Sequence, residues 1–334
     1  MALALLSLLG SLLGPSSVAR LPGIRYAVDV AVVTEADGSL TAIDAETYAI
    51  RDRVPAGAID LLASRTTPGS LTALEPGDQG TGLAVEWAWG RGAFVARSYQ
   101  PFAAEGGRLV DVNASVVGYA FDEGTTLFTS KDGVSTGVVE GIPSSAVAVA
   151  EDAESSDVYA LEDDGTTFAL RRSHAAPGAL EDLGVAWSIP KSDGETAAVV
   201  NHLGHPALVT LTSKLMEAVA DDGSVLASAK VKLPSAAIAD AMSLGERGIL
   251  VLTRPTAKLY VLTGQHAEPI TLKSGGTITE APWFSHRLAF DEARDRAWVA
   301  TDAGLFRVQL GALTATKIEG TTATAVALLY APED

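Results

Sequence analysis

Residues 30–57 read VAVVTEADGSLTAIDAETYAIRDRVPAG and contain the pattern that decides the fold. Residues 30–34 are a short β-rich run, and Ala36-Asp37-Gly38 supplies the Asp-Gly pair typical of a hairpin turn. A second run follows at residues 39–44, and after a short turn a third covers residues 48–54. The stretch therefore predicts three consecutive strands joined by tight turns.

Weaker copies of this unit recur along the rest of the chain. From Tyr26 onward there is no sustained helical period, and short β-rich runs alternate with Gly-containing turns. Seven units divide the chain from Tyr26 to Asp334 into about 44 residues each, the length of a four-stranded propeller blade. The clearer copies cover residues 147–172, 248–263 and 286–310, and the less regular ones cover 82–99, 115–140 and 196–214.

The two ends of this repeat region complement each other. The chain ends on an isolated strand at residues 323–330, and the hairpin that begins at Tyr26 lacks a preceding inner strand. Pairing these two strands would complete one blade and leave no open sheet edge. We therefore predict an all-β, seven-bladed β-propeller over residues 26–334, closed by its terminal strands. The alternative is a pair of β-sandwich domains that divide near residues 177–194.

The end of the second strand carries a family resemblance. Ile43-Asp44-Ala45-Glu46-Thr47 resembles the "IDxxT" that recurs in YVTN-type β-propellers, and the repeat is also similar to quinoprotein-like propellers. The resemblance covers the chain beyond residue 25. A quinoprotein would imply a quinone-type cofactor, held by a metal and several convergent polar groups. No such set can be assembled from this sequence, so we expect no cofactor.

Residues 1–25 are predicted to be an appendage of the propeller. The apolar run at residues 2–14 is too short to span a bilayer, which needs about 20 residues. Because no Lys or Arg precedes the run, we favour a helix that docks onto an assembly over a cleaved signal segment with Ser17-Val18-Ala19 as its processing site. The docking residues would be Leu5, Leu6, Leu8, Leu9, Leu12 and Leu13.

Charge and cysteine content exclude several classes of function. The chain carries 41 acidic and 24 basic residues, a net charge of −17, so it repels phosphate and is not expected to bind nucleic acid. With no cysteine, it has no disulfide, no thiolate nucleophile and no cysteine-ligated zinc.

Two short motifs suggest catalysis or metal binding but lack the necessary context. Residues 133–137, GVSTG, match a nucleophile elbow, yet Gly141 and Pro143 exclude the helix that must follow it. His202 and His205 flank a predicted Leu203-Gly204 hairpin turn, and without a third ligand we interpret them as exposed turn residues rather than a metal site. No catalytic or metal-binding residue is therefore predicted.

Acidic and aromatic residues are assigned mostly to turns and core. The acidic clusters at 151–154, 162–165 and 221–223 lack the ligand spacing of a calcium loop, and we interpret them as solvated turns. Trp87 and Trp89 share one strand face and are predicted to pack between sheets. The binding candidates are Trp283, Phe284 and His286, because they lie in a connection before an inner strand, where propeller partners usually bind.

These observations favour a non-enzymatic interaction protein. We expect a propeller built into a larger assembly, such as a virion tail or tail tip, with neighbouring protein subunits as partners and a host surface glycan or protein as a further one. The alternative is a secreted or periplasmic YVTN-like propeller that binds a small ligand or a protein. Neither hypothesis places the chain across a membrane.

Overall fold

The computed structural model describes most of the chain beyond residue 25. The described ranges are 26–63, 69–76, 82–102, 108–113, 116–120, 126–130, 139–142, 146–152, 157–176, 179–279 and 286–332. The proposed docking helix and the GVSTG motif therefore lie outside the described residues.

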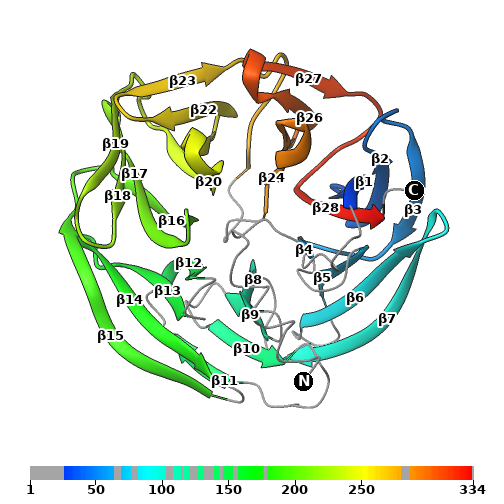
Figure 1. The fold of residues 1–334 in the computed structure, drawn as a ribbon, viewed down its shortest axis with the longest axis horizontal. Helices are drawn as coiled ribbons and strands as arrows, with labels where there is room; N and C mark the ends of the chain where they lie inside the picture. The colour runs from blue at the N-terminus through cyan, green and yellow to red at the C-terminus, as the bar shows by residue number, and fades with distance from the viewer. Residues whose placement is uncertain are drawn as a thin grey trace.

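The described strands form seven four-stranded antiparallel sheets (Figure 1). From the inner to the outer strand, the first sheet contains β28 (Ala325–Pro332), β1 (Tyr26–Thr34), β2 (Ser39–Asp44) and β3 (Ile50–Pro55). The next contains β4 (Asp60–Ala63), β5 (Ser70–Pro76), β6 (Gly82–Gly90) and β7 (Ala93–Phe102), followed by β8 (Arg108–Asn113), β9 (Val116–Ala120), β10 (Thr126–Ser130) and β11 (Val139–Ile142).

The other four sheets repeat this order. They contain β12 (Ala146–Asp152), β13 (Asp157–Asp163), β14 (Thr167–Ala176) and β15 (Ala179–Pro190); β16 (Thr196–His202), β17 (His205–Leu211), β18 (Leu215–Ala220) and β19 (Val225–Lys230); β20 (Ala237–Ser243), β21 (Ile249–Arg254), β22 (Lys258–Thr263) and β23 (His266–Ile270); and β24 (Leu288–Asp291), β25 (Arg296–Thr301), β26 (Gly304–Gln309) and β27 (Thr314–Ile318). Three short 3-10 helices, η1 (Gly245–Arg247), η2 (Glu292–Arg294) and η3 (Leu310–Ala312), complete the described elements.

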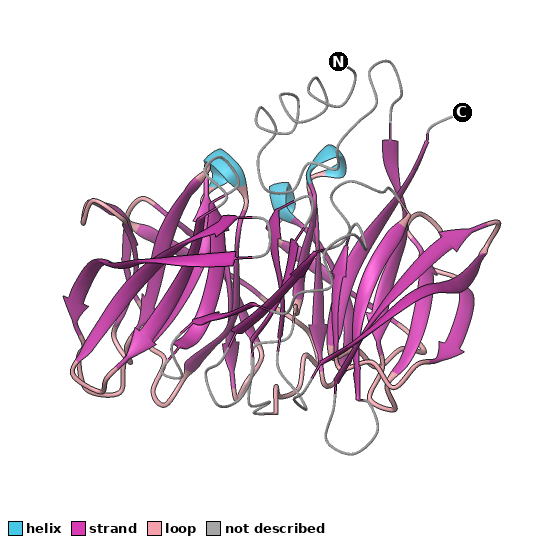
Figure 2. Ribbon diagram, turned by 90° about the horizontal axis from the view of Figure 1, so that it is seen from below, coloured by secondary structure: helices cyan, strands magenta, loops and turns pink. Residues whose placement is uncertain are grey.

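The sheets stand around a common centre, with their first strands innermost (Figure 1). Figure 2 shows the same arrangement from the side, with the three 3-10 helices on one face of the ring. The all-β propeller prediction is confirmed. The two-sandwich alternative is wrong, because β15 occupies most of the proposed boundary and pairs with β14 along its whole length. The described part of the chain contains no helix with the length and hydrophobicity needed to cross a bilayer.

The first and last strands of the chain lie side by side. β1 pairs antiparallel with β28, and Val33 lies opposite Val326 in this register. A bulge between Val28 and Val30 shifts the register once along the pair. The terminal strand thus supplies the inner strand that the first hairpin lacks.

The third strand of the opening stretch begins later than predicted, at Ile50 rather than at Tyr48. Asp44 Oδ1 accepts hydrogen bonds from the backbone N–H groups of Glu46 and Thr47, at 3.0 and 2.7 Å. This Asx-type turn places Tyr48 at a φ of 61°, outside the strand region. Two other predicted strands also begin two residues late, at Leu288 and Ala325.

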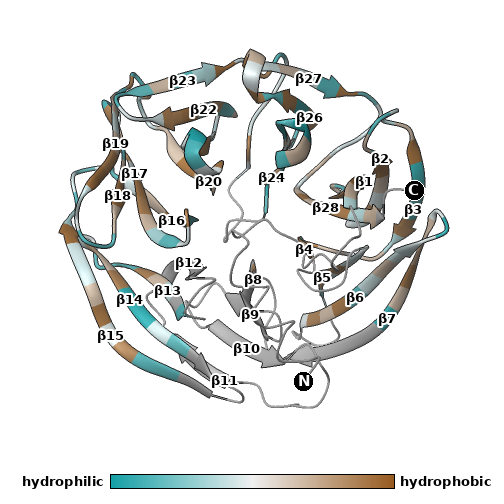
Figure 3. Cartoon of the chain, in the orientation of Figure 1, coloured by the Kyte–Doolittle hydropathy of each residue, from teal (hydrophilic) through white to brown (hydrophobic). Residues whose placement is uncertain are grey.

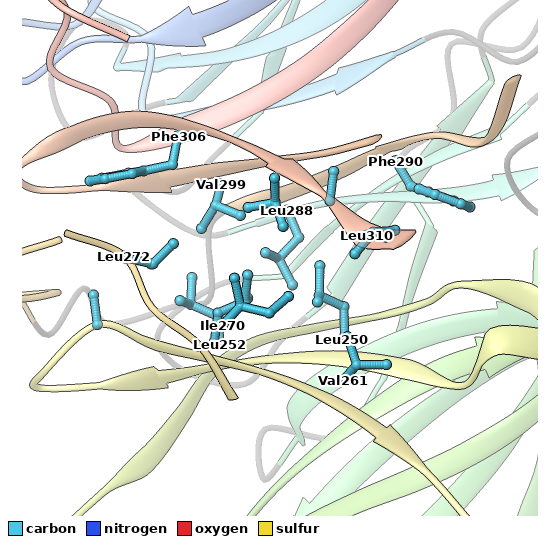
Figure 4. Close-up of a cluster of buried hydrophobic side chains, with 14 of the residues drawn as sticks. Leu250, Leu252, Val261, Ile270, Leu272, Leu288, Phe290, Val299, Phe306 and Leu310 are labelled. Carbon is cyan, nitrogen blue, oxygen red and sulfur yellow. The ribbon is translucent and has the colours of Figure 1, made fainter. Parts of the chain in front are cut away.

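The core lies between neighbouring sheets rather than in one central mass. Several inner and middle strands, such as β2, β17, β21 and β25, carry runs of consecutive buried residues, as expected of sheets that pack through both faces. Figure 3 shows hydrophobic segments around the ring. Figure 4 shows one such cluster, in which Leu250, Leu252 and Val261 of one sheet meet Val299 and Phe306 of the next.

Candidate functional site

Only His286 of the three predicted binding residues can be placed. Trp283 and Phe284 lie outside the described residues. His286 lies two residues before β24, and its carbonyl oxygen accepts a hydrogen bond of 2.7 Å from the backbone N–H of Val326 in β28. The residue is therefore anchored to the neighbouring sheet as well as to its own.

Asp60 is the first residue of β4, and it hydrogen-bonds to His286 across the sheet that contains β28 and β1. Asp60 Oδ1 accepts a bond of 2.8 Å from the His286 backbone N–H and lies 3.0 Å from His286 Nδ1. Asp60 Oδ2 lies 3.0 Å from the same ring nitrogen and accepts a bond of 2.9 Å from the backbone N–H of Leu109 in β8. The fully buried carboxylate therefore joins β4 to β8 and to the segment before β24.

These contacts determine which atom His286 presents to a partner. Because the Asp60 carboxylate only accepts hydrogen bonds, we assign the proton to Nδ1 of the ring. In the neutral imidazole Nε2 carries the lone pair, and Nε2 has no partner within the described part of the chain. The His286 side chain as a whole is 21% exposed.

Arg287 lies beside His286 and is buried. Its Nη1 donates to Asp302 Oδ1 at 3.4 Å. Burial lowers the pKa of the guanidinium from its ordinary value, and the carboxylates of Asp302, Asp240 and Asp60 oppose this shift.

Two of these carboxylates also position the backbone. Asp240 Oδ2 accepts the backbone N–H groups of Arg287 and Leu288 at 2.8 and 3.0 Å. Asp302 Oδ2 accepts both the N–H and the hydroxyl of Thr279 at 2.6 Å. We call Asp60, Asp240, His286, Arg287 and Asp302 the central polar cluster.

The central polar cluster has a distinct charge composition. It combines three carboxylates with one guanidinium and one imidazole, so hydrogen-bond donors and positive charge are favoured over anions. No group of three or more His, Asp or Glu residues in the described ranges could hold a metal ion.

The histidine pair follows the prediction only in part. Leu203 and Gly204 form the predicted turn, with φ of 54° and 90°, and His205 is exposed. His202 is half-buried, contrary to our interpretation, because its Nδ1 lies 2.9 Å from Ser243 Oγ on the neighbouring sheet. Burial lowers the pKa of His202 below its ordinary value.

The acidic turn at residues 162–165 has structural roles. Asp164 Oδ1 accepts the backbone N–H groups of Thr166 and Thr167 at 2.7 and 2.6 Å, and these bonds lower the pKa of its carboxyl. Asp163 Oδ2 pairs with Lys191 Nζ at 2.5 Å. The carboxylates of Asp163 and Asp164 therefore have protein partners in or beside the turn, as expected of structural turn residues.

The tryptophans in the described residues pack into the sheets. Trp87 and Trp89 both contact Phe94, with ring centroids 6.3 and 5.1 Å apart, so they lie on one face as the alternation predicts. Trp298 is fully buried. These rings do not form an exposed stacking platform.

Asp60 and Arg287 were not predicted from the sequence. Asp60 is 226 residues from His286 in the chain, so only the ring brings them together. A signal for Asp60 was present, since Asp60 is a lone acid at the start of the apolar run DLLA. For Arg287, adjacency to His286 was the only indication.

Comparisons with known proteins agree with the fold. No protein-family model matches the chain, and no curated protein matches its sequence. A functionally unknown protein from Desulfotomaculum acetoxidans has a TM-score of 0.66 at 12% identity, over 90% of this chain and 99% of that one. A protein from Lactobacillus plantarum has a TM-score of 0.59 at 12% identity, over 91% and 99%.

A third similar structure carries the fold in its description. The β-propeller domain of Cps50 (Swd1) from Myceliophteria thermophila has a TM-score of 0.51 at 9% identity, over 81% of this chain and 86% of that one. At these identities the likeness concerns the fold alone. Together with the ring of four-stranded sheets, it identifies the chain as a β-propeller.

Proposed function

We propose that this propeller is a binding scaffold rather than an enzyme, and that its partner docks over the central polar cluster. The supporting observation is His286, whose Nδ1 is held by a fully buried carboxylate while Nε2 has no partner in the described residues. An imidazole fixed in this way is oriented in advance, which reduces the entropy lost on binding.

The charge of the molecule supports a particular class of partner. The chain has a net charge of −17, and three carboxylates surround the single guanidinium of the cluster. A basic surface would be attracted over long range, and a lysine, arginine or hydroxyl could donate to His286 Nε2. The proposed partner is therefore a protein that presents such donors.

A closed ring would give this surface its rigidity. We propose that the seven sheets act as seven blades and that the β1–β28 pairing closes them. Closure would fix the spacing of β4, β20 and β24, which contribute Asp60, Asp240 and the segment carrying His286. The partner would then meet a preformed surface.

Photo-crosslinking at position 286 tests the binding surface. A photoreactive amino acid replaces His286 in the full chain within its native source, and a second variant carries it at exposed His205 as the control. We expect a protein adduct of defined mass at position 286 and none at 205. A small-molecule adduct would favour the ligand-binding alternative. Equal adducts at both positions, or none, would contradict the proposal.

The kind of assembly remains a separate proposal. A virion tail or tail tip was inferred from residues 1–25, and the alternative is a secreted or periplasmic propeller. The intact mass of the protein from its native source distinguishes them. A chain that retains residues 2–14 supports incorporation through the apolar segment, whereas a chain that begins near Arg20 supports export.

A further inference from the structure

A pocket of about 280 Å³ lies between two neighbouring sheets, away from the central polar cluster. It is formed by the turn between β2 and β3 on one side and by β26 and β27 on the other. Its lining residues are Tyr48, Arg307, Thr316, Lys317, Ile318 and Glu319. A volume of this size suits a small molecule rather than a protein segment.

Strand register determines what the pocket presents. Arg307 in β26 lies opposite both Trp298 in β25 and Thr316 in β27, so these three side chains form one row on the same face. Tyr48 packs against this row, with its ring centroid 6.2 Å from that of Trp298. The fully buried Trp298 therefore supports the pocket from below.

Arg307 is positioned but not neutralised. Its guanidinium carbon lies 4.9 Å from the centroid of the Tyr48 ring, and its Nη1 donates to the Tyr48 hydroxyl. Within the described ranges no carboxylate pairs with Arg307 or with Lys317, although acidic residues outnumber basic ones across the chain. An arginine has five N–H donors, so most of those on Arg307 are available to a ligand.

We propose that this pocket binds a small molecule bearing a carboxylate or a phosphate group. The anion accepts hydrogen bonds from the Arg307 guanidinium, and the Thr316 hydroxyl lies beside it on the next strand. Tyr48 positions the guanidinium through its hydroxyl and a cation–π contact, which suits two-point recognition of a planar or tetrahedral anion. The distant carboxylates of the chain repel the bound anion only weakly, because salt screens charges that are more than about 8 Å apart at physiological ionic strength.

Lys317 and Glu319 have different expected roles. Lys317 lies in β27 next to Thr316, and Glu319 lies in the turn that follows the strand, so both reach the pocket from its rim. Lys317 contributes general positive charge. Glu319 is the only carboxylate in the lining and repels an anion.

The test is calorimetric titration of the full chain at physiological ionic strength, where the distant carboxylates are screened, with inorganic phosphate and succinate as separate probes. Arg307→Gln should weaken binding at least tenfold, because it removes the charged donor and retains an amide that can contact Tyr48. Arg97→Gln is the matched control, since Arg97 is an exposed arginine on the outer strand β7. It should change affinity less than twofold.

Two more variants sharpen the result. Glu319→Gln should tighten binding about two- to threefold by removing a like charge, and His286→Ala should have no effect. Preference for succinate or for phosphate identifies the anion class. Equal losses in Arg307→Gln and Arg97→Gln, or no binding of either probe, would overturn the proposal. Circular dichroism and melting curves exclude misfolding as the cause.

Discussion

At the scale of single residues, Asp60 contributes more contacts than its short side chain suggests. It is fully buried, yet it accepts hydrogen bonds from Leu109 and from both the backbone and the ring of His286. A buried carboxylate is tolerated when several N–H donors surround it. Asp60 is therefore both a positioning residue for His286 and a structural link between sheets.

Asp60→Ala should destabilise the protein by about 3 kcal/mol or more, because it leaves several buried donors without an acceptor. The free energy of unfolding in urea measures this. Asp222→Ala is the control, since Asp222 is an exposed turn residue that accepts from Ser224 N at 2.8 Å. It should cost less than about 1 kcal/mol. Equal losses in the two variants would show that Asp60 is no more than a turn-like contact.

Glu75 provides a prediction with a defined pH dependence. Burial raises the pKa of this carboxyl above its ordinary value of 4.5, and the hydrogen bond from Trp87 Nε1 only partly opposes it. The charged form therefore destabilises the fold at neutral pH. The penalty diminishes as pH falls through the raised pKa and is absent below the unfolded value.

Glu75→Gln should accordingly stabilise the protein at pH 7 by on the order of 1 kcal/mol, and the amide oxygen can still accept from Trp87. At about pH 4 the variant and the parent should be equally stable. Urea unfolding at several pH values measures the difference. Glu268→Gln, at an exposed position in β23, is the control. A difference that does not vary with pH would exclude burial of charge as the cause.

At the scale of the element, the first hairpin depends on a close approach of two glycines. Gly38 has a φ of 79°, and a Cβ there would lie 2.7 Å from Gly57 Cα and 2.8 Å from its carbonyl carbon. Both contacts are with backbone, which cannot move without displacing the start of the next sheet. The turn therefore needs glycine for space as well as for conformation.

Gly38→Ala should cost about 2–4 kcal/mol, which combines the left-handed conformation with the backbone clash. Gly57→Ala is its matched control. Gly57 also has a positive φ of 76°, but its Cβ would meet only the Pro76 side chain at 3.6 Å. It should cost about 1 kcal/mol. Thermal and urea unfolding compare the two, and equal losses would refute the steric explanation.

Element order and strand type were predictable from the sequence, whereas strand ends and the site were not. The Asp-Gly turn at Gly38 and the alternation in β2 are local signals. The late start of β3 depends on hydrogen bonds that the Asp44 carboxylate accepts from the backbone N–H groups of Glu46 and Thr47, and the periodicity of the sequence does not reveal them. The contact between Asp60 and His286 depends on the geometry of the whole ring, because the two residues are 226 positions apart.

At the scale of the whole molecule, the pairing of β1 with β28 joins the two ends of the sequence. Replacing Ala27 and Ala331, which lie opposite each other, with cysteines should allow a disulfide. The chain has no other cysteine, so no competing bond can form. Because the bond closes a loop of roughly 300 residues, oxidation should stabilise the variant, at most by about 5–6 kcal/mol.

The same variant in its reduced form is the control. The difference between the oxidised and reduced midpoints of urea unfolding reports the constraint on the unfolded chain. If strain at the bulge between Val28 and Val30 were severe, the oxidised form would be the less stable one. That result would contradict our expectation that β1 and β28 stay paired beyond the bulge, as far as Tyr26 and Pro332.

The position of β28 also has a consequence for biosynthesis. β1 ends at Thr34, but its inner neighbour β28 is encoded by residues 325–332, after the strands of the other six sheets. At translation rates of about 5–20 residues per second, β1 waits roughly 15–60 s with one edge unpaired. The first sheet is therefore the last of the seven to be completed, and the inner edge of β1 stays unpaired while the other six sheets are synthesised.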